Sequence, residues 1–191
     1  MVSRTHKNMK KYASRVSRLM ARLDYRAIRD VADCFCRARE RSSTIFFAGN
    51  GGSASTASHF AQDLAAIGKK AGKRGFKAIS LADNSPAITA LANDYGYDGI
   101  FTGQMRELFK EKDVLVAISA SGNSPNIVKA AEFAKRSGGT TVCLVGFDGG
   151  ALAKISDHCM HVKTGKGEYG PVEDIHLILE HMITTYLCAN L

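Results

Sequence analysis

Residues 113–135 constrain the fold more than any other part of this sequence. They begin with an uninterrupted apolar run at 114–118, whose branched residues are typical of a parallel strand buried on both faces. A turn rich in serine follows, and Pro125 then opens a segment with helical character. A strand, a short turn and a helix in this order predict an α/β fold with a parallel sheet.

The turn between this strand and helix carries three hydroxyl side chains. They are Ser119, Ser121 and Ser124, and Ser124 is placed to act as the N-cap with Pro125 at the first helical position. Free backbone N–H groups and the positive end of the helix dipole meet these hydroxyls at one point. Capping needs only one hydroxyl, so we interpret the turn as a pocket for a phosphate-sized anion.

Strands and helices alternate along the rest of the chain. We expect further strands at 44–48, 76–81, 140–145 and 158–162, and further helices at 53–67, 84–92, 100–109, 151–155 and 172–188, with a break at 93–96. This order predicts a doubly wound, mostly parallel five-stranded sheet flanked by helices. With 191 residues, the chain is expected to form a single domain. In this domain, residues 1–41 form a leading helix, and 42–191 form the α/β core with the C-terminal helix.

The first 41 residues differ from the rest in charge. They hold twelve Lys/Arg and four Asp/Glu, whereas the remaining chain holds 14 of each, so the net charge of +8 belongs to this segment. Apolar residues at helical spacing predict one long helix over 7–41, which suggests oligomerisation through helix packing. We interpret its basic stripe as a solvated face and not as a nucleic-acid site, because no aromatic residues interleave (Lys11, Arg15, Arg18, Arg22 and Arg29).

Composition and cysteine usage predict a cytoplasmic protein without a membrane span. No apolar run approaches the ~20 residues that cross a bilayer, and the basic N-terminus lacks the apolar core of a signal peptide. The five cysteines are odd in number and lie mostly in apolar contexts, as reduced core residues do. Cys34 and Cys36 form one close pair, and without a second pair we do not interpret them as a metal site.

A second glycine-rich turn, at 49–53, follows the first strand. Ligands of doubly wound sheets bind at the carboxyl ends of the strands, where both turns are expected to lie. His59 and Asp63 on the next helix are four residues apart and share one face. From spacing alone they can relay a proton, share a metal, or form an ordinary surface ion pair.

The same turn also matches a loose dinucleotide-binding pattern. Gly49, Gly51 and Ala54 have the required spacing, and Asp83 follows the next strand as the ribose-binding acid would. A lone match of this kind is weak, and it leaves the serine turn unexplained. We therefore do not favour a nicotinamide enzyme.

The last helix concentrates titratable side chains within nine residues. His176 and Glu180 are four apart, and we interpret them as a solvated stabilising pair. Glu173 and His181 are eight apart, which is about 12 Å of helical rise. They can serve one small site only at full reach, if Glu173 precedes regular helix, or if they come from different subunits.

Three motifs together resemble the sugar isomerase (SIS) family and, within it, the phosphoheptose isomerase branch. They are Gly-Asn-Gly-Gly-Ser at 49–53 with His-Phe-Ala-Gln-Asp at 59–63, Ser-Ala-Ser-Gly-Asn-Ser at 119–124, and Glu-Asp-Ile-His-Leu-Ile-Leu-Glu-His at 173–181. Asn-Asp-Tyr-Gly at 93–96 adds to the match. The likeness runs from about residue 44 to 188 in consistent order, and 7–41 match only as a leading helix.

This resemblance implies a homotetrameric aldose–ketose isomerase of a phosphorylated sugar, with sedoheptulose 7-phosphate as the expected substrate. It implies phosphate binding by Ser119, Ser121 and Ser124, with other substrate contacts from Asn50, Gly51, Gly52, Ser53, Asn93, Asp94, Ala120 and Glu173. It implies Asp63 as the base and His181 as the acid of proton transfer. It also implies a possible Zn²⁺ bound by His59, Asp63, Glu173 and His181.

Three positions depart from the family's usual pattern. Asp63 stands where Glu is usual, and its side chain is one methylene shorter, which changes the reach of a base. Glu173 stands where Gln is usual and adds a charge that strengthens cation binding. Ala120 replaces Thr and removes a hydroxyl from the phosphate pocket. The alternative interpretation is a non-catalytic phosphosugar-binding adaptor of the same fold, which binds a protein or nucleic-acid partner.

Overall fold

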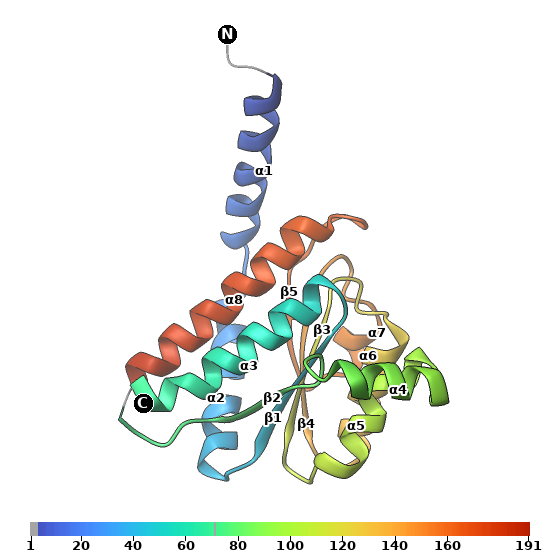
Figure 1. The fold of residues 1–191 in the computed structure, drawn as a ribbon. Coiled ribbons are helices and arrows are strands. Elements are labelled where there is room, and N and C mark those ends of the chain that lie inside the picture. The colour runs from blue at the N-terminus through green and yellow to red at the C-terminus, as the bar shows by residue number, and fades with distance from the viewer. Residues whose placement is uncertain (1–3, 71) are drawn as a thin grey trace.

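The computed structural model describes residues 4–70 and 72–191 (Figure 1). Its helices are α1 (Arg4–Met20), α2 (Tyr25–Glu40), α3 (Gly52–Lys70), α4 (Ser85–Tyr95), η1 (Tyr97–Gly99), α5 (Ile100–Leu108), α6 (Pro125–Arg136), α7 (Gly150–Ile155) and α8 (Tyr169–Asn190). Its strands are β1 (Thr44–Gly49), β2 (Lys77–Ser80), β3 (Val114–Ser119), β4 (Thr140–Val145) and β5 (His158–His161). They pair in parallel in the order β2-β1-β3-β4-β5, which confirms the predicted sheet.

The sheet separates two apolar cores. Side chains alternate along each strand, so Phe47 of β1 packs on the face covered by α2, α3 and α8, while Phe46 packs toward α5, α6 and α7. The rings of Phe35, Phe47 and Phe60 meet at centroid distances of 4.8–6.4 Å and hold α2 and α3 on β1. Because Phe60 follows His59 directly, this packing also fixes the position of His59 on α3.

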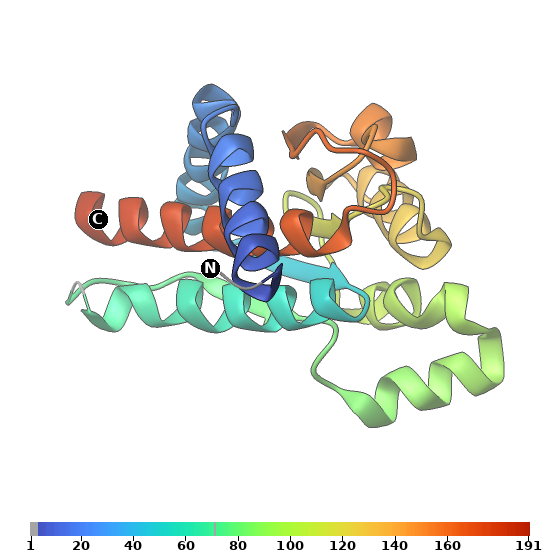
Figure 2. The ribbon, with the colours of Figure 1, turned by 90° about the horizontal axis from the view of Figure 1, so that it is seen from above.

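The chain reverses its winding between β1 and β3, two adjacent strands of the sheet. α3 follows β1 on one face, and α6 follows β3 on the other face. Turns that leave adjacent strands in opposite directions open a crevice at the carboxyl edge. The glycine turn and the serine turn both lie there, as the sequence predicts. α3 and α8 run side by side on the same side of the sheet (Figures 1 and 2).

The leading segment differs from the prediction, because the expected helix over 7–41 is two helices. α1 ends at Met20, and Asp24 caps α2 by accepting hydrogen bonds from two backbone N–H groups at 2.9 and 3.3 Å. Leu19 and Ile28 are both buried, so the apolar stripe continues across the break. Periodicity alone therefore misses the turn. α1 extends away from the sheet (Figure 1).

The predicted helix break at 93–96 also differs. Asn93 and Asp94 continue α4, and the helix ends only before Gly96, whose φ of 81° suits glycine. α8 begins at Tyr169, three residues earlier than predicted. Across the described residues, none of the helices combines the length and apolar character that a bilayer crossing requires.

Candidate functional site

The crevice between β1 and β3 contains a small cavity of about 170 Å³. Its lining residues are Asn50, Ser53, Ile118, Ser119, Ala120, Ser121, Ser124, Tyr169 and Glu173. We call this cavity the serine pocket. Whole-ligand pockets usually measure about 300–1,000 Å³, so this one suits a terminal group such as a phosphate.

The three serine hydroxyls of the pocket face one another. Ser119 Oγ lies 3.1 Å from Ser124 Oγ and 3.5 Å from Ser121 Oγ. Ser124 is the N-cap of α6, as predicted, but its hydroxyl makes no capping bond and turns toward the pocket instead. Gly122 permits this tight turn, because its φ is 65° and a Cβ there would lie 2.1 Å from the carbonyl oxygen of Gly149. The three serine hydroxyls and the backbone N–H groups at the N-terminus of α6 can therefore bind an anion.

Asn50 forms the opposite wall of the serine pocket. Its side-chain amide exchanges two hydrogen bonds of 2.9 Å with that of Asn126, and the hydroxyl of Tyr97 donates to its Oδ1 at 3.1 Å. Sequence reasoning missed both partners, although Asn126 directly follows the serine turn and Tyr97 follows the 93–96 motif. Asn93 and Asp94 do not line this cavity, and their side chains bond each other at 2.9 Å on exposed α4.

Glu173 closes the serine pocket near the start of α3. A Cβ at Gly52 would lie only 2.5 Å from Glu173 Oε2, so glycine is what allows the carboxylate to approach. The neighbouring Gly51 has a φ of 55°. A carboxylate at a helix N-terminus interacts favourably with the helix dipole. Ser53, which follows Gly52, is buried and lines the same cavity.

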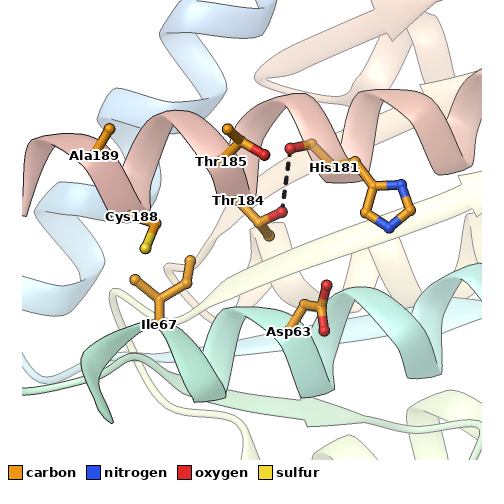
Figure 3. A pocket seen from close by; sticks show the side chains of 7 residues that line it. All are labelled: Asp63, Ile67, His181, Thr184, Thr185, Cys188 and Ala189. Atoms are coloured by element: carbon orange, nitrogen blue, oxygen red, sulfur yellow. Dashed lines mark hydrogen bonds between the residues drawn. The ribbon is translucent and has the colours of Figure 1, made fainter. Parts of the chain in front are cut away.

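A second cavity, of about 360 Å³, lies between α3 and α8. Its lining residues are Asp63, Ile67, His181, Thr184, Thr185, Cys188 and Ala189. Figure 3 shows the side chains of Asp63 and His181 entering the same space from the two helices. The two residues predicted as base and acid therefore line one cavity within a single chain.

Four titratable side chains meet at the edge of this second cavity, and we call them the histidine–carboxylate cluster: His59, Asp63, Glu180 and His181. His59 Nε2 lies 3.6 Å from Asp63 Oδ2, and the two imidazole rings meet at a centroid distance of 5.0 Å. One ligand atom from each residue lies within 4.8 Å of all the others. Two imidazoles and two carboxylates are donors that zinc accepts, so these residues fit a divalent cation.

The interpretation of His176 and Glu180 as a solvated pair is wrong, because both side chains are 0% exposed. Burial raises the pKa of Glu180, and the nearby His181 and His59 oppose that shift. Burial lowers the pKa of His176 to about 4. Among the described residues, Glu180 Oε2 has no hydrogen-bond partner, although it lies 3.2 Å from Nε2 of His181. Spacing failed here because apolar and titratable residues are mixed around α8, so no single apolar stripe marks its inward face.

Three of the four predicted metal ligands come together, and Glu180 joins them. Glu173 lies instead in the serine pocket, about 12 Å of helical rise from His181. The sequence carries one signal for Glu180. It is a glutamate beside His181 within an otherwise apolar stretch of the last helix.

Two contacts join α1 to the first turns of α8 and to the loop before it. The guanidinium of Arg15 donates to both carboxylate oxygens of Glu168 at 2.9 and 2.8 Å, and the hydroxyl of Tyr12 donates to Asp174 at 2.6 Å. The Arg15 bonds hold the pKa of Glu168 down at about 2. Arg15 is therefore half-buried in a contact with Glu168, whereas Arg18 of the same predicted basic stripe is exposed.

Comparisons with known proteins identify the relatives of this chain. The family model of the SIS domain matches residues 10–146. A phosphoheptose isomerase of Helicobacter pylori strain P12 is 41% identical over 145 residues, which cover 75% of this chain and 73% of that protein. A probable phosphoheptose isomerase of Thermoplasma acidophilum is 36% identical over 91% of this chain and 94% of its own. The structure of a phosphoheptose isomerase from Neisseria gonorrhoeae superimposes with a TM-score of 0.85 at 28% identity, covering 96% of both chains.

Proposed function

Because the chain belongs to the SIS domain family and, within it, to the phosphoheptose isomerases, we infer that it is an aldose–ketose isomerase. Its substrate is sedoheptulose 7-phosphate, and the product is a D-glycero-D-manno-heptose 7-phosphate. One observation carries this inference at the level of the site. The serine pocket lies at the starts of α3 and α8, and the histidine–carboxylate cluster lies further along the same two helices.

The serine pocket holds the phosphate in this proposal. Ser119, Ser121 and Ser124 donate their hydroxyls to phosphate oxygens, and the N-terminus of α6 adds backbone N–H groups. Asn50 and Ser53 meet hydroxyls along the sugar chain. The helical rise from Ser53 to His59 is about 9 Å, so a seven-carbon substrate anchored by its phosphate extends along α3 toward the cluster. Remote anchoring of this kind fixes the reacting end.

The histidine–carboxylate cluster transfers the protons. Asp63 takes the proton from the carbon beside the carbonyl, and the electron pair of that C–H bond becomes the C=C bond of an enediol. His181 gives a proton to the carbonyl oxygen in the same step. In the second step, a proton is added to C2, the former carbonyl carbon, and the hydroxyl on C1 loses its proton. The carbonyl thereby moves from C2 to C1. A carboxylate and an imidazole suit this task because the first can accept a proton from carbon and the second can donate one to oxygen.

A divalent cation, which we propose to be zinc, fits beside these residues. His59, Asp63 and His181 would hold it, since their donor atoms lie within 4.8 Å of one another. When bound, such an ion polarises a carbonyl and shares the negative charge of an enediol. A homotetramer, a cytoplasmic location and the absence of nucleic-acid binding stay predictions from the sequence.

A substrate screen tests this function directly. The purified full-length chain is incubated with C5, C6 and C7 ketose phosphates, with and without added zinc, and aldose phosphates are separated and identified by mass. We expect conversion of the C7 ketose phosphate and at least about tenfold less of the shorter ones. No aldose phosphate from any of them under either condition would overturn the proposal and favour the adaptor interpretation.

A further inference from the structure

We propose that Asn126 and Tyr97 are positioning residues, which hold the side-chain amide of Asn50 so that it offers the sugar phosphate a hydrogen-bond donor and no acceptor. This inference rests on the proposed function, because Asn50 is a substrate contact of that same site. The observation behind it is a hydrogen-bond network at the wall of the serine pocket that occupies both lone pairs of Asn50 Oδ1.

The buried side chain of Asn126 joins two turns of the chain. Pro125 takes the first position of α6 and Asn126 follows it, so this amide lies in the first turn of the helix. It is only 1% exposed, and it exchanges hydrogen bonds of 2.9 Å in both directions with Asn50, which follows β1. A buried amide is unfavourable without partners. The pair therefore ties the turn after β1 to the start of α6.

The backbone of α6 determines which way the Asn126 amide faces. The N–H of Ile127 reaches Asn126 Oδ1 at 3.0 Å and the carbonyl oxygen of Ser124 at 3.0 Å, a shared bond of the kind that is common at helix termini. If the amide were turned over, its NH₂ group would face this N–H, and two donors would meet. Asn126 Oδ1 therefore stays toward the backbone, and Asn126 Nδ2 donates to Asn50.

This orientation leaves Asn50 with one unused polar group. Its Oδ1 accepts from Asn126 Nδ2 at 2.9 Å and from the hydroxyl of Tyr97 at 3.1 Å, which occupies both lone pairs of the oxygen. Its Nδ2 carries two hydrogens, and among the described residues only one of them has a partner, Asn126 Oδ1. Because Asn50 lines the serine pocket, the group left for a ligand is an N–H. Such a group binds an oxygen of the sugar phosphate that accepts.

Tyr97 is held in place separately from the two asparagines. It begins η1, and the next residue, Asp98, accepts a 3.0 Å hydrogen bond from Lys129 of α6. The Tyr97 side chain is 55% exposed, so it contributes little to the apolar cores. Its hydroxyl can therefore be removed without a large loss of stability, and the network can be tested from its exposed end.

Affinity for the sugar phosphate tests the network without relying on turnover. Calorimetric titration with sedoheptulose 7-phosphate gives Kd for full-length chains that also carry Asp63→Asn, which slows consumption of the ligand. We expect Asn126→Ala to raise Kd about three- to tenfold, the range of one neutral hydrogen bond, and Tyr97→Phe to raise it about twofold. With Asp63 intact, KM should rise in the same way while kcat stays within about twofold.

A double-mutant cycle separates positioning from a merely structural role. If Asn126 acts through Asn50, Asn126→Ala should change Kd by less than about 1.5-fold in a chain that already carries Asn50→Ala. Tyr97→Phe takes the place of Asn126→Ala in this cycle if the latter does not fold. Tyr95→Phe is the matched control for Tyr97→Phe, since Tyr95 is a 74% exposed tyrosine on α4, and it should leave Kd unchanged.

Two substitutions of Asn50 test the donor directly. Asn50→Ala removes the amide, whereas Asn50→Asp keeps its shape and replaces the donor with an acceptor. We expect Asn50→Asp to raise Kd more than Asn50→Ala does. If Asn50 instead accepted a hydrogen bond from a sugar hydroxyl, Asn50→Asp would keep the affinity of wild type.

The outcomes separate this inference from the proposed function. Equal effects of Asn126→Ala with and without Asn50→Ala, unchanged Kd in both Asn126→Ala and Tyr97→Phe, or unchanged Kd in Asn50→Asp would each overturn the inference and leave the isomerase intact. Absence of sugar phosphate binding by the parent chain would overturn both. If the Kd values follow our expectation while the wild-type chain forms no aldose phosphate, the positioning roles stand and the proposed function fails.

Discussion

The serine pocket and the histidine–carboxylate cluster lie along the same pair of helices, yet their polar groups are satisfied in opposite ways. In the serine pocket, neutral hydroxyls bond one another at 3.1 and 3.5 Å, and an arriving anion exchanges one set of hydrogen bonds for another. In the cluster, a buried carboxylate oxygen has no partner among the described residues. The hydroxyls of the serine pocket therefore have partners before a ligand binds, whereas the cluster contains a buried carboxylate oxygen that no hydrogen bond stabilises.

The two regions also differ in how the sequence builds them. Ser119, Ser121 and Ser124 lie in one turn, so local structure alone brings their hydroxyls together. His59 and His181 are separated by more than a hundred residues and meet only because α3 packs against α8. The hydroxyls that we propose to bind phosphate thus come from one local turn, whereas the residues that we propose for proton transfer meet only through tertiary packing. The predictions below test that division.

The largest expected effect is on turnover when the cluster loses a proton-transfer group. We expect Asp63→Asn and His181→Ala each to lower kcat by about 10²–10⁴-fold, since general acid–base catalysis contributes that much. KM should change by no more than about threefold, because the phosphate contacts remain. Steady-state kinetics on sedoheptulose 7-phosphate provide the measurement.

Thr185→Ala is the control for these variants, since Thr185 lines the same cavity without a titratable group. Near wild-type kcat in both Asp63→Asn and His181→Ala, with folding intact, would show that the cluster does not perform the chemistry.

A second effect concerns His176, which lies on α8 between Glu173 and Glu180. Burial lowers its pKa to about 4, whereas an unfolded histidine titrates near 6.5. Between these values the unfolded chain binds the proton more tightly, so stability is retained above about pH 6.5 and is lost as pH falls toward 4. The difference corresponds to about 3 kcal/mol.

Urea unfolding of wild type and His176→Leu at pH 7 and pH 4.5 measures this loss. We expect the stability of the wild type to fall more steeply than that of the variant as the solution is acidified. Parallel curves for the two proteins would contradict the assignment of acid sensitivity to His176.

Much of the fold follows from local patterns in the sequence, and the remainder depends on packing that no local pattern encodes. Apolar runs between turns predict the five strands, and the serine turn predicts the start of α6 at Pro125. The turn before Asp24 interrupts the leading helix without interrupting its apolar stripe, so periodicity carries no mark of it. The continuation of α4 through Asn93 and Asp94 is similar, because only Gly96 forces the end.

The candidate site shows the same limit more sharply. Spacing predicts that His59 and Asp63 share a face, and they do approach to 3.6 Å. Spacing cannot say which face of α8 meets α3, because apolar and titratable residues are mixed around α8 and mark no single apolar stripe. Glu180 and His176 were therefore assigned to solvent although both are buried. Only the packing of α3 against α8 reveals that Glu180 belongs to the cluster.

A third effect should fall on binding and not on turnover. Ser121→Ala removes a hydroxyl from the serine pocket, and we expect KM for the sugar phosphate to rise about tenfold, the order of a lost hydrogen bond to a charged group. The kcat should stay within about twofold, because the cluster is untouched. Ser137→Ala, at the other end of α6, serves as the control. A fall in kcat with unchanged KM would break the division between the two regions.

The smallest effect tests whether α1 supports the serine pocket from outside. Arg15 holds Glu168 through two hydrogen bonds, and Glu168 in turn accepts a 2.7 Å bond from the backbone of Gly165. The next residue, Tyr169, lines the serine pocket and packs on Phe147 at a ring distance of 5.0 Å. Arg15→Ala should therefore raise KM by about two- to threefold with kcat unchanged, because partly exposed ion pairs are weak.

Arg18→Ala is the matched control for Arg15→Ala, since Arg18 is an exposed arginine one turn further along α1. The exchange of both partners, Arg15→Glu with Glu168→Arg, should restore part of the lost affinity if the ion pair itself positions the loop. An equal rise in KM for Arg15→Ala and Arg18→Ala would instead indicate that the general positive charge of α1 attracts the anionic substrate, and that α1 does not act through the pocket wall.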